Sequence, residues 1–483
     1  MKNLRDILYK TGMLEVIGQT DHAVSGVVSD SKQVKPGDLF VAIKGMQTDG
    51  HRFIPQAIEA GAKAVVCEEM PEHCPEGVTC IRVKDSRSGA AIMSANFYDH
   101  PSGKLKLVGV TGTNGKTSIA TLLYDLFSGM GHPCGLLSTI RIMIAGKAFD
   151  TALTTPDAIR LNQMLYDMVQ AGCDHVFMEV SSHAMVQKRI EGIAFAGGVF
   201  TNITHDHLDY HASFKEYLQA KKSFFDGLGK KAFALINKDD KNGPVMLQNT
   251  RARAVTYGLT TAADYQGRLL ESSLSGMHMQ IDRSDFWSKL VGRFNASNLL
   301  AVYATAHLLG ADKAEVLQIL SQCSAPEGRF EHFTTKDNIT VIVDYAHTPD
   351  ALDNVLKTIS EIRTRQETLF TVVGCGGNRD KAKRPLMAAI AVSHSDKVIL
   401  TSDNPRMEDP DMIIEDMKAG LDVLTRKKAI SITNRREAIH AACQLAKAGD
   451  IILIAGKGHE KVQEIQGVKH TFDDKQIAIE ALR

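Results

Sequence analysis

A lysine that follows a glycine-rich turn is the clearest chemical signal in the sequence. Residues 109–117 read GVTGTNGKT, between the apolar run KLKLVGV and the helical run TSIATLLYDLFSGMG. Backbone N–H groups in such a turn face an anion, Lys116 can reach the outer phosphates, and Thr117 can bind Mg²⁺. The spacing departs from G-x-x-x-x-G-K-[ST], because Val110 stands where the first glycine is expected. The flanking strand and helix favour a nucleoside-triphosphate site over a glycine-rich surface turn.

A carboxylate and a group of histidines follow two later apolar runs. Glu179 ends the run HVFMEV and precedes Ser181-Ser182-His183. A carboxylate at a strand end near a phosphate-binding loop is a natural Mg²⁺ ligand. A serine hydrolase is disfavoured, because the chain has no G-x-S-x-G turn. The segment TNITHDHLDYH could be a transition-metal site, but it lacks thiolates and the H-E-x-x-H spacing, so most of its side chains are expected to be loop and capping groups.

Four further segments carry polar side chains that could contact a ligand. The adjacent Lys221 and Lys222 lie on a predicted helix, where such a pair normally forms a solvated patch. The basic segment RDKAKR can bind anionic groups or face solvent. The DNPR turn presents Asn404 and Arg406. In the segment GKGHE, Glu460 can hold an ammonium group. The segments are AKKSFF at 220–225, RDKAKR at 379–384, DNPR at 403–406 and GKGHE at 456–460.

The elements that must position these residues alternate between strand and helix. Apolar runs such as KLKLVGV, HVFMEV and GGVFTNI alternate with helical segments, which is typical of a parallel sheet with crossover helices. After residues 326–329 the alternation restarts, with ITVIVDY, LFTVVG, DKVILTS and DIILIAG as strands. Ligands bind at the carboxyl ends of strands in such sheets, and the chemically promising residues follow strand ends.

Composition indicates a protein of about three domains with no global charge bias. The chain has 483 residues, 44% hydrophobic and 23% charged, with 56 basic and 56 acidic side chains. This balance suggests neither nucleic-acid binding nor membrane binding, and we expect no signal peptide or membrane insertion. The eight cysteines are scattered without a C-x-x-C pair, which argues against a disulfide framework and a zinc site and favours a reduced cytoplasm.

Taken in order, these motifs resemble the Mur ligase family. The resemblance runs from Asp30-Ser31 through TGTNGKT, TTP, EVSSH, HDHLDYH, the lysine helix, EGRFE, DYAHTPDAL, GGNRDKAKRP, DNPR and GKGHE. It implies an α/β fold with a UDP-substrate-binding domain at 1–103, a central P-loop ATPase domain at 104–331 with a mostly parallel sheet, and a Rossmann-like amino-acid-binding domain at 332–483.

The resemblance also implies roles for individual residues. The implied ATP site comprises Thr111, Gly112, Thr113, Asn114, Gly115, Lys116, Thr117, Asn298 and Arg329. Contacts with UDP-N-acetylmuramoyl-dipeptide are implied for Ser31, Met46, Gln47, Thr48, Thr154, Thr155, Ser181, Gln187 and Arg189. Contacts with meso-diaminopimelate are implied for Arg379, Asp403, Asn404, Pro405, Arg406, Gly456 and Glu460.

Catalysis and metal binding are likewise assigned by the resemblance. Catalytic roles fall on Lys116, Glu179, His207 and Lys221, and Mg²⁺ ligands on Thr117, Glu179 and His207. Two Mg²⁺ ions are expected. Lys221, rather than its neighbour Lys222, matches the lysine that is carbamylated to N6-carboxylysine in the family.

The implied activity is that of an ATP-dependent ligase in cytoplasmic peptidoglycan precursor synthesis. It would add meso-diaminopimelate to UDP-N-acetylmuramoyl-L-alanyl-D-glutamate through an acyl phosphate, and we expect a monomer. Three alternatives stay open: a sister enzyme that adds lysine, a folate polyglutamating ligase, and a nucleotide-dependent switch without chemistry. Arg406 favours diaminopimelate over lysine, since the extra carboxylate needs a fixed cation.

Overall fold

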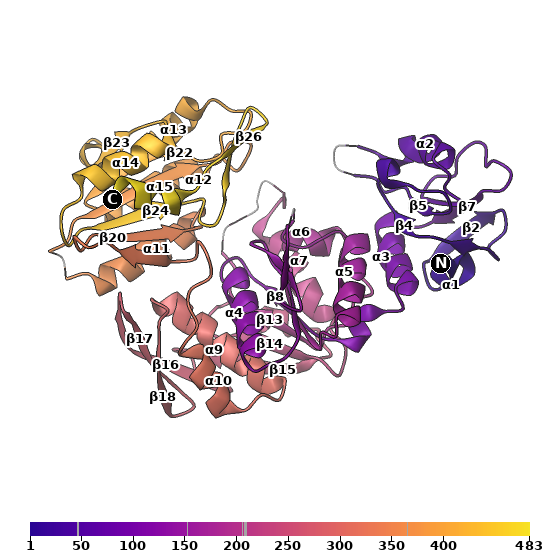
Figure 1. The fold of residues 1–483 in the computed structure, drawn as a ribbon, viewed down its shortest axis with the longest axis horizontal. Helices are drawn as coiled ribbons and strands as arrows, with labels where there is room; N and C mark the ends of the chain where they lie inside the picture. The colour runs from indigo at the N-terminus through magenta and orange to yellow at the C-terminus, as the bar shows by residue number, and fades with distance from the viewer. Residues whose placement is uncertain (46–47, 152, 205, 207–209, 365) are drawn as a thin grey trace.

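The chain folds into three lobes that follow one another along the sequence. A computed structural model of the chain describes residues 1–45, 48–151, 153–204, 206, 210–364 and 366–483. Within these ranges the larger sheets have five, eleven and six strands, one sheet in each lobe. Figure 1 shows the N-terminal lobe in indigo, the central lobe in magenta and pink, and the C-terminal lobe in orange and yellow. The mostly parallel sheets and their crossover helices confirm the predicted α/β class.

The N-terminal lobe is built on a mixed sheet in the order β2-β7-β6-β5-β4. Its strands are β2 (Met13–Ile17), β4 (Val27–Val28), β5 (Leu39–Val41), β6 (Ala64–Cys67) and β7 (Thr79–Val83), with β1 (Lys2–Asn3) paired to β3 (Ala23–Val24). Its helices are α1 (Leu4–Ile7), α2 (Ile54–Glu59) and α3 (Ser86–Phe97). Asp85 caps α3 by accepting from the backbone N–H groups of Arg87 and Ser88, which fixes where that helix begins.

The central lobe holds a long sheet in the order β11-β10-β9-β12-β8-β13-β14-β15-β16-β17-β18. Its strands are β8 (Lys106–Thr111), β9 (Cys134–Leu137), β10 (Ile142–Ile144), β11 (Lys147–Phe149), β12 (His175–Glu179), β13 (Gly197–Phe200), β14 (Phe233–Asn237), β15 (Arg253–Gly258), β16 (Tyr265–Ser273), β17 (Gly276–Ile281) and β18 (Ser284–Ser288). Its helices are α4 (Lys116–Gly129), α5 (Ala158–Gln170), α6 (Ser182–Val186), α7 (Phe214–Asp226), α8 (Gly243–Met246), α9 (Arg293–Leu308) and α10 (Lys313–Leu320). Within the stretch β9-β12-β8-β13-β14-β15-β16 of this order, neighbouring strands are parallel. The strands β10 and β11 at one edge and β17 and β18 at the other are antiparallel to their neighbours.

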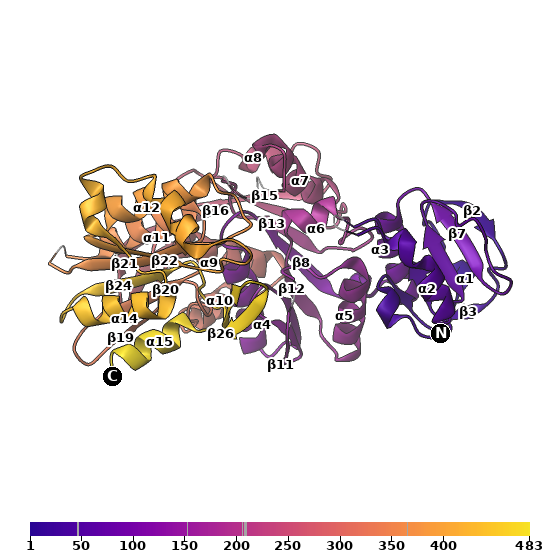
Figure 2. The same ribbon diagram turned by 90° about the horizontal axis from the view of Figure 1, so that it is seen from above.

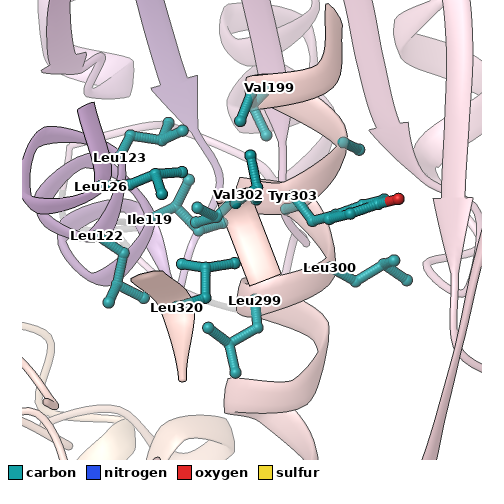
Figure 3. Packing of buried hydrophobic residues seen from close by; sticks show 14 of the residues in the cluster. Ile119, Leu122, Leu123, Leu126, Val199, Leu299, Leu300, Val302, Tyr303 and Leu320 are labelled. Atoms are coloured by element: carbon teal, nitrogen blue, oxygen red, sulfur yellow. The ribbon is translucent and has the colours of Figure 1, made fainter. Parts of the chain in front are cut away.

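Apolar faces of α4, α9 and α10 form the core beneath one face of this sheet. Figure 3 shows side chains of α4 pointing toward α9, with Val199 of β13 above them and Leu320 of α10 below. The labelled side chains are all buried: Ile119, Leu122, Leu123, Leu126, Val199, Leu299, Leu300, Val302, Tyr303 and Leu320. Burial of this kind stabilises the fold by about 1.5–3 kcal/mol per large apolar side chain, so α4 is held rigidly at the end of β8.

Two glycines, one within β8 and one in the turn that follows it, allow close packing around the P-loop. A Cβ at Gly109 would lie 2.6 Å from Phe224 Cζ, so this glycine lets β8 pack closely against α7. Gly115 has φ 88°, a left-handed conformation, and a Cβ there would lie 2.7 Å from Asn298 Oδ1. The glycines therefore bring α7 and α9 up to the turn that carries Lys116.

The C-terminal lobe contains a second doubly wound sheet in the order β19-β20-β24-β21-β22-β23. Its strands are β19 (Glu331–Thr334), β20 (Thr340–Asp344), β21 (Leu369–Cys375), β22 (Lys397–Ser402), β23 (Ala429–Ser431) and β24 (Ile451–Ala455), and β25 (Val462–Ile465) forms a hairpin with β26 (Val468–Thr471). Its helices are α11 (Pro349–Ile362), α12 (Lys383–His394), α13 (Pro410–Lys418), α14 (Arg435–Leu445) and α15 (Asp474–Ala481). Only β19 is antiparallel among the described strands of this sheet. Figure 2 shows α11 and α12 on one side of the sheet and α14 and α15 on the other.

One expectation from the cysteines is wrong. Cys74 and Cys80 form a disulfide, with their Cα atoms 6.2 Å apart, whereas the sequence argued against disulfides. The loop before β7 turns back on the strand and brings the two residues within bonding range, which their separation in the sequence did not reveal. The remaining six cysteines are free thiols.

Among the helices of the described ranges, none combines the length and the apolar character that crossing a bilayer requires.

Candidate active site

A cavity of about 750 Å³ lies between the central and C-terminal lobes. Its walls come from the P-loop, the end of β12, α7 and α9 on the central side. On the other side they come from the ends of β20, β21, β22 and β24. Strand ends of both parallel sheets thus open into one space, as the strand-end rule predicts.

The P-loop surrounds the amine of Lys116 with carbonyl oxygens. Its Nζ donates to the carbonyl oxygens of Gly112 at 2.9 Å and Thr113 at 2.8 Å. Asn202 Oδ1 accepts from the Asn114 backbone N–H at 2.9 Å and holds the loop open toward the cavity. Burial lowers the pKa of the Lys116 ammonium, because the charged form is less stable away from water. An anion beside Lys116 would stabilise that charge. Residues 113–117 line the cavity, whereas Thr111 and Gly112 support them from beneath.

Glu179 and Thr117 supply oxygen atoms at the phosphate end of the cavity. The Glu179 side chain is 1% exposed and accepts from the Thr139 backbone N–H at 2.7 Å and from its hydroxyl at 3.2 Å. Thr117 Oγ1 accepts from Arg329 Nη2 at 3.0 Å. A carboxylate and a hydroxyl are hard oxygen donors, so these residues fit a Mg²⁺ ion. His207, the third expected ligand, lies outside the described residues.

The two adjacent lysines of α7 are buried, so the expected solvated patch is wrong. Lys222 forms an ion pair with Asp226 at 2.7 Å, which turns it away from the cavity. Lys221 lines the cavity, where its Nζ donates to the carbonyl oxygen of Gly112 at 2.8 Å and lies 4.6 Å from the centre of the Tyr217 ring. Burial, with help from nearby Lys116, brings the pKa of Lys221 well below its usual value. The tertiary packing of α7 against β8 causes both burials, and no local pattern signals it.

Asn298 and Arg329 reach the P-loop from distant parts of the chain. Asn298 donates to Asn295 Oδ1 at 3.2 Å, and its own Oδ1 lies beside Gly115. The Arg329 guanidinium lies 4.4 Å from the centre of the Tyr345 ring while it bonds Thr117. The structure therefore gathers both predicted residues beside the loop.

A second group of predicted residues meets just beyond Glu179. Thr155 Oγ1 donates to the Glu179 carbonyl at 2.8 Å, and it lies 3.3 Å from Ser181 Oγ. Arg189 donates to the carbonyl of Thr155 at 2.6 Å and to Gln187 Oε1 at 2.6 Å. Thr154 accepts from Thr139 and lines the cavity with Thr155, Ser181 and Arg189. Gln187 stands behind Arg189 and orients it.

The residues expected at the uridine end lie apart from this cavity, in the N-terminal lobe. Ser31 is buried and donates to Gln56 Oε1 at 3.1 Å. The carbonyl of Thr48 accepts from the Gly45 N–H at 2.9 Å. Met46 and Gln47 lie outside the described residues. Such a separation suits a substrate that is long enough to reach between lobes.

The residues expected to bind an amino acid line the opposite end of the cavity from Glu179. Arg406 Nη1 donates to the carbonyl of Gly377 at 2.8 Å, and its Nε lies 3.9 Å from Glu464 Oε2. Asn404 Nδ2 donates to Glu460 Oε2 at 2.8 Å. The members of this group that line the cavity are Arg379, Asp403, Asn404, Arg406, Gly456 and Glu460. Pro405 lies between two of them and shapes the turn.

Arg406 is held in an unusual backbone conformation. Its φ is 52°, in the left-handed region that a non-glycine residue rarely adopts. Its N–H donates to Glu464, its carbonyl accepts from the Gln466 N–H, and the residue pairs with Ile465 as an isolated bridge. The hairpin β25–β26 thus anchors this backbone, and strain of this sort concentrates at functional sites.

Sequence reasoning missed residues that stand on the same strand ends. Asp344, the last residue of β20, is buried in the cavity wall and accepts from the N–H groups of Phe330 and Ala346. Burial raises the pKa of this carboxyl to about 6. Tyr345 and Asn295 support Arg329 and Asn298. The strand-end rule could have found Asp344, because it is the penultimate residue of the predicted run ITVIVDY.

A second cluster of metal-type side chains lies at the opposite end of the central sheet. Asp174 accepts from His175 Nδ1 at 2.8 Å and from His132 Nδ1 at 2.9 Å, the only such group of three among the described residues. His175 Nε2 is buried without a partner, so a metal on Nδ1 would force an unpaired N–H into the core. Hydrogen bonding between the loops accounts for this cluster better than metal binding does.

Comparison with known proteins assigns the fold. Family models match three successive parts: residues 23–98 match "Mur ligase family, catalytic domain", 110–306 match "Mur ligase middle domain" and 328–458 match "Mur ligase, glutamate ligase domain". The chain is 56% identical over 480 residues to the UDP-N-acetylmuramoyl-L-alanyl-D-glutamate–2,6-diaminopimelate ligase of Cytophaga hutchinsonii, covering 99% of each. It is 55% identical over 463 residues to the ligase of the same name from Phocaeicola vulgatus, covering 96% of each.

A solved structure agrees with these relatives. A structure that bears the same enzyme name superposes with a TM-score of 0.70 at 35% identity, covering 100% of this chain and 98% of that chain. Three ordered family matches and relatives more than half identical over nearly the whole length give one conclusion: the chain belongs to the Mur ligase family.

Proposed function

We propose that this chain is an ATP-dependent ligase that adds meso-diaminopimelate to UDP-N-acetylmuramoyl-L-alanyl-D-glutamate, a step in peptidoglycan precursor synthesis. The relatives described above carry the name of a ligase for this pair of substrates. These names, at 56%, 55% and 35% identity, favour diaminopimelate over the lysine and folate alternatives.

One observation carries the proposal. A single cavity contains both Lys116 of the P-loop and Arg406 of the DNPR turn, on facing lobes. A carboxylate held between the two walls can therefore be reached by a phosphoryl donor on the Lys116 side and by an amine on the Arg406 side. Amide-bond formation needs this convergence, whereas a nucleotide-dependent switch does not.

The first step would activate a carboxylate. The D-glutamate carboxylate attacks the γ-phosphorus of ATP, and ADP leaves an acyl phosphate behind. Lys116, freed from the Gly112 and Thr113 carbonyls, and the P-loop N–H groups would stabilise charge on the transferring group. The amine of the incoming amino acid then attacks the acyl carbon, and phosphate departs from the tetrahedral intermediate.

Metal and carbamate chemistry would support this step. Bound Mg²⁺ supplies charge neutralisation between the carboxylate and the γ-phosphate. Glu179, Thr117 and, by resemblance, His207 would hold it; two ions are proposed. Lys221 is buried beside the P-loop, and burial lowers its pKa, which favours the uncharged amine that can react with CO₂. Carbamylation replaces this amine with an anion, the charge that a metal site needs.

The amino-acid end of the cavity suits a zwitterion with an extra carboxylate. Arg406 offers a planar fork for the distal carboxylate, and Arg379 adds a second cation nearby. Glu460 offers an anion for the distal ammonium. Lysine lacks this carboxylate, so the Arg406 fork, whose Nε lies 3.9 Å from Glu464, would meet no anion on the substrate.

Three broader features belong to the same proposal. Domains would extend over 1–103, 104–331 and 332–483, with the uridine end of the substrate on Ser31, Met46, Gln47 and Thr48. Each range holds one of the three larger sheets, except that β19 of the third sheet begins at Glu331, one residue before the third range. The chain would act as a monomer in the cytoplasm, where ATP and UDP-linked substrates are available.

A panel of amino acids tests the proposal. Purified protein is incubated with ATP, Mg²⁺, UDP-N-acetylmuramoyl-L-alanyl-D-glutamate and one amino acid, and product mass and phosphate release are measured. We expect one phosphate per product with meso-diaminopimelate and little product with lysine. Equal use of lysine, or phosphate release without an amide product, would refute the assignment.

A further inference from the structure

Behind the amino-acid end of the cavity lies a buried lysine. Lys457 is 0% exposed, and its Nζ donates to Asn404 Oδ1 at 3.0 Å and to Glu460 Oε2 at 2.8 Å. An ammonium is rarely buried unless it is paired. Both of its side-chain partners line the cavity, so this cation is built into the wall rather than into the general core.

The bonds of Lys457 fix which way the Asn404 amide faces. Asn404 Oδ1 accepts from Lys457 Nζ and also from the Glu464 backbone N–H at 3.0 Å. Two donors on one side leave the amide only one favourable orientation, with its NH₂ group on the cavity side. One N–H of this group bonds Glu460 Oε2, and the other suits a carboxylate on a bound amino acid.

Lys457 also gives the two carboxylate oxygens of Glu460 different roles. Lys457 Nζ and Asn404 Nδ2 both bond to Oε2, each at 2.8 Å. No bond to Oε1 is found among the described residues, so this oxygen is the one available to a substrate ammonium. An anion and a donor thus stand at defined positions beside the Arg406 fork.

A second buried ion pair keeps the lysine in place. Arg435 and Asp474 are both fully buried and bond at 2.7 and 2.8 Å, and Arg435 Nη2 also donates to the carbonyl of Ala455 at 3.0 Å. Ala455 ends β24 and lies two residues before Lys457. The ion pair therefore fixes the strand end from which Lys457 projects.

We propose that Lys457 is a positioning residue that sets amino-acid specificity. By fixing the Asn404 amide and the Glu460 carboxylate, it makes the pocket select a substrate that carries both an extra carboxylate and a distal ammonium. This inference rests on the proposed function. Lys457 itself lies behind the wall and acts through these two side chains.

Replacing Lys457 with methionine, of similar length and no charge, tests the inference. In Lys457→Met the Asn404 amide can turn over and Glu460 loses its fixed partner. We expect the KM for meso-diaminopimelate to rise about 10- to 100-fold, the range for loss of a buried charged hydrogen-bond partner. Preference for diaminopimelate over lysine should fall about tenfold or more, while the KM for ATP stays unchanged.

The first half-reaction separates positioning from general damage. Without an amino acid, hydroxylamine nitrogen attacks the acyl phosphate carbonyl, giving a hydroxamate and free phosphate. We expect Lys457→Met to form hydroxamate at the wild-type rate, and the exposed Lys469→Met control to match wild type in every assay. An equal loss of hydroxamate and ligation would mean that Lys457 only supports the fold.

The remaining outcomes are also distinct. If wild-type protein makes no product with diaminopimelate, the proposed function fails. If wild type works and Lys457→Met keeps its KM and its preference, this inference alone is wrong. Should the methionine variant not fold, Lys457→Gln, which keeps an N–H donor without the charge, is held to the same criteria.

Discussion

Two amines converge on one carbonyl oxygen at the P-loop. Lys116 Nζ and Lys221 Nζ donate to the oxygen of Gly112 at 2.9 and 2.8 Å. Two ammonium groups so close repel one another, and burial withholds the water that would screen them. Burial, and after it the nearby Lys116 charge, lower the pKa of Lys221, which favours the uncharged form of this amine.

Lys221 should therefore react with CO₂. Protein equilibrated with ¹³C-bicarbonate is expected to show a carbamate resonance by NMR that is absent in Lys221→Ala. That variant should be nearly inactive and partly rescued by a short carboxylic acid, which replaces the lost anion. Lys222→Ala is the matched control, since Lys222 pairs with Asp226 and should leave the carbamate signal intact. An active wild-type enzyme with no carbamate would contradict the idea.

Arg406 should determine which amino acid the enzyme selects. Arg406→Ala is expected to lose most diaminopimelate activity through a raised KM, while the KM for ATP changes little. A site built around a polar group can reject an analogue that lacks it by roughly 10⁴-fold, so the wild-type preference over lysine should largely disappear. Arg426→Ala, an exposed arginine of the same lobe, serves as the control. An unaltered preference for diaminopimelate over lysine in Arg406→Ala would show that Arg406 does not bind the distal carboxylate.

At the scale of elements, loops after strand ends owe their shape to buried ion pairs. Arg384, at the start of α12, is 1% exposed and bonds both oxygens of Glu408 at 2.9 and 3.0 Å and Asp416 at 2.8 Å. Glu408 follows the DNPR turn, and its carboxylate also accepts from the Asn378 N–H. One arginine thus joins the DNPR turn, the loop after β21 and α13.

Glu408→Gln should make the melting temperature less dependent on pH in the acidic range. The Arg384 bond lowers the pKa of Glu408 from 4.5 to about 2. Because the folded pKa is depressed, the stabilisation is complete above about pH 4.5 and is lost as pH falls toward 2. The melting temperature of Glu408→Gln should lie below wild type at pH 7, and the difference should shrink between pH 4.5 and pH 2. A constant difference over that range would exclude this pair as the cause.

At the scale of the whole molecule, a few polar contacts join the lobes. Asp350 of α11 accepts from Asn114 of the P-loop at 2.8 Å and from Thr204 at 3.3 Å. On the other side, Ser88 donates to Glu191 at 2.7 Å, linking the N-terminal and central lobes. Val291 and Phe294 of the central lobe also pack into the apolar core of the C-terminal lobe. The proposed reaction requires closure of the lobes around the acyl phosphate.

Asp350→Ala should loosen the junction between the central and C-terminal lobes. We expect a larger radius of gyration by small-angle scattering and a kcat/KM for the amino acid that is lower by roughly 3- to 10-fold, as for loss of one or two hydrogen bonds. Asp353→Ala is the matched control, because Asp353 lies on the same helix but pairs with Lys357 and His394 of its own lobe. Identical scattering and kinetics for the two variants would show that Asp350 does not hold the central and C-terminal lobes together.

Local patterns determined much of this protein. The turn before Lys116, the strand that ends in Glu179 and the DNPR turn stand where their flanking runs predicted, because strand and helix periodicity and glycine placement act over a few residues. Parallel sheets then bring successive strand ends to one edge, so sequence reasoning could place Arg379, Asp403 and Glu460 at the same end of the cavity.

Only the tertiary structure decided which polar side chains are buried and with whom. Lys221, Lys222 and Lys457 all read as ordinary lysines, yet the packing of the fold buries all three. Lys221 bonds Gly112, far away in the chain, whereas Lys222 and Lys457 pair with Asp226 and Glu460 of their own segments. The Cys74–Cys80 bridge and the convergence of Asn114 with Asp350 are of the same kind. Burial and pairing depend on long-range packing, and packing carries no signature in a short stretch of sequence.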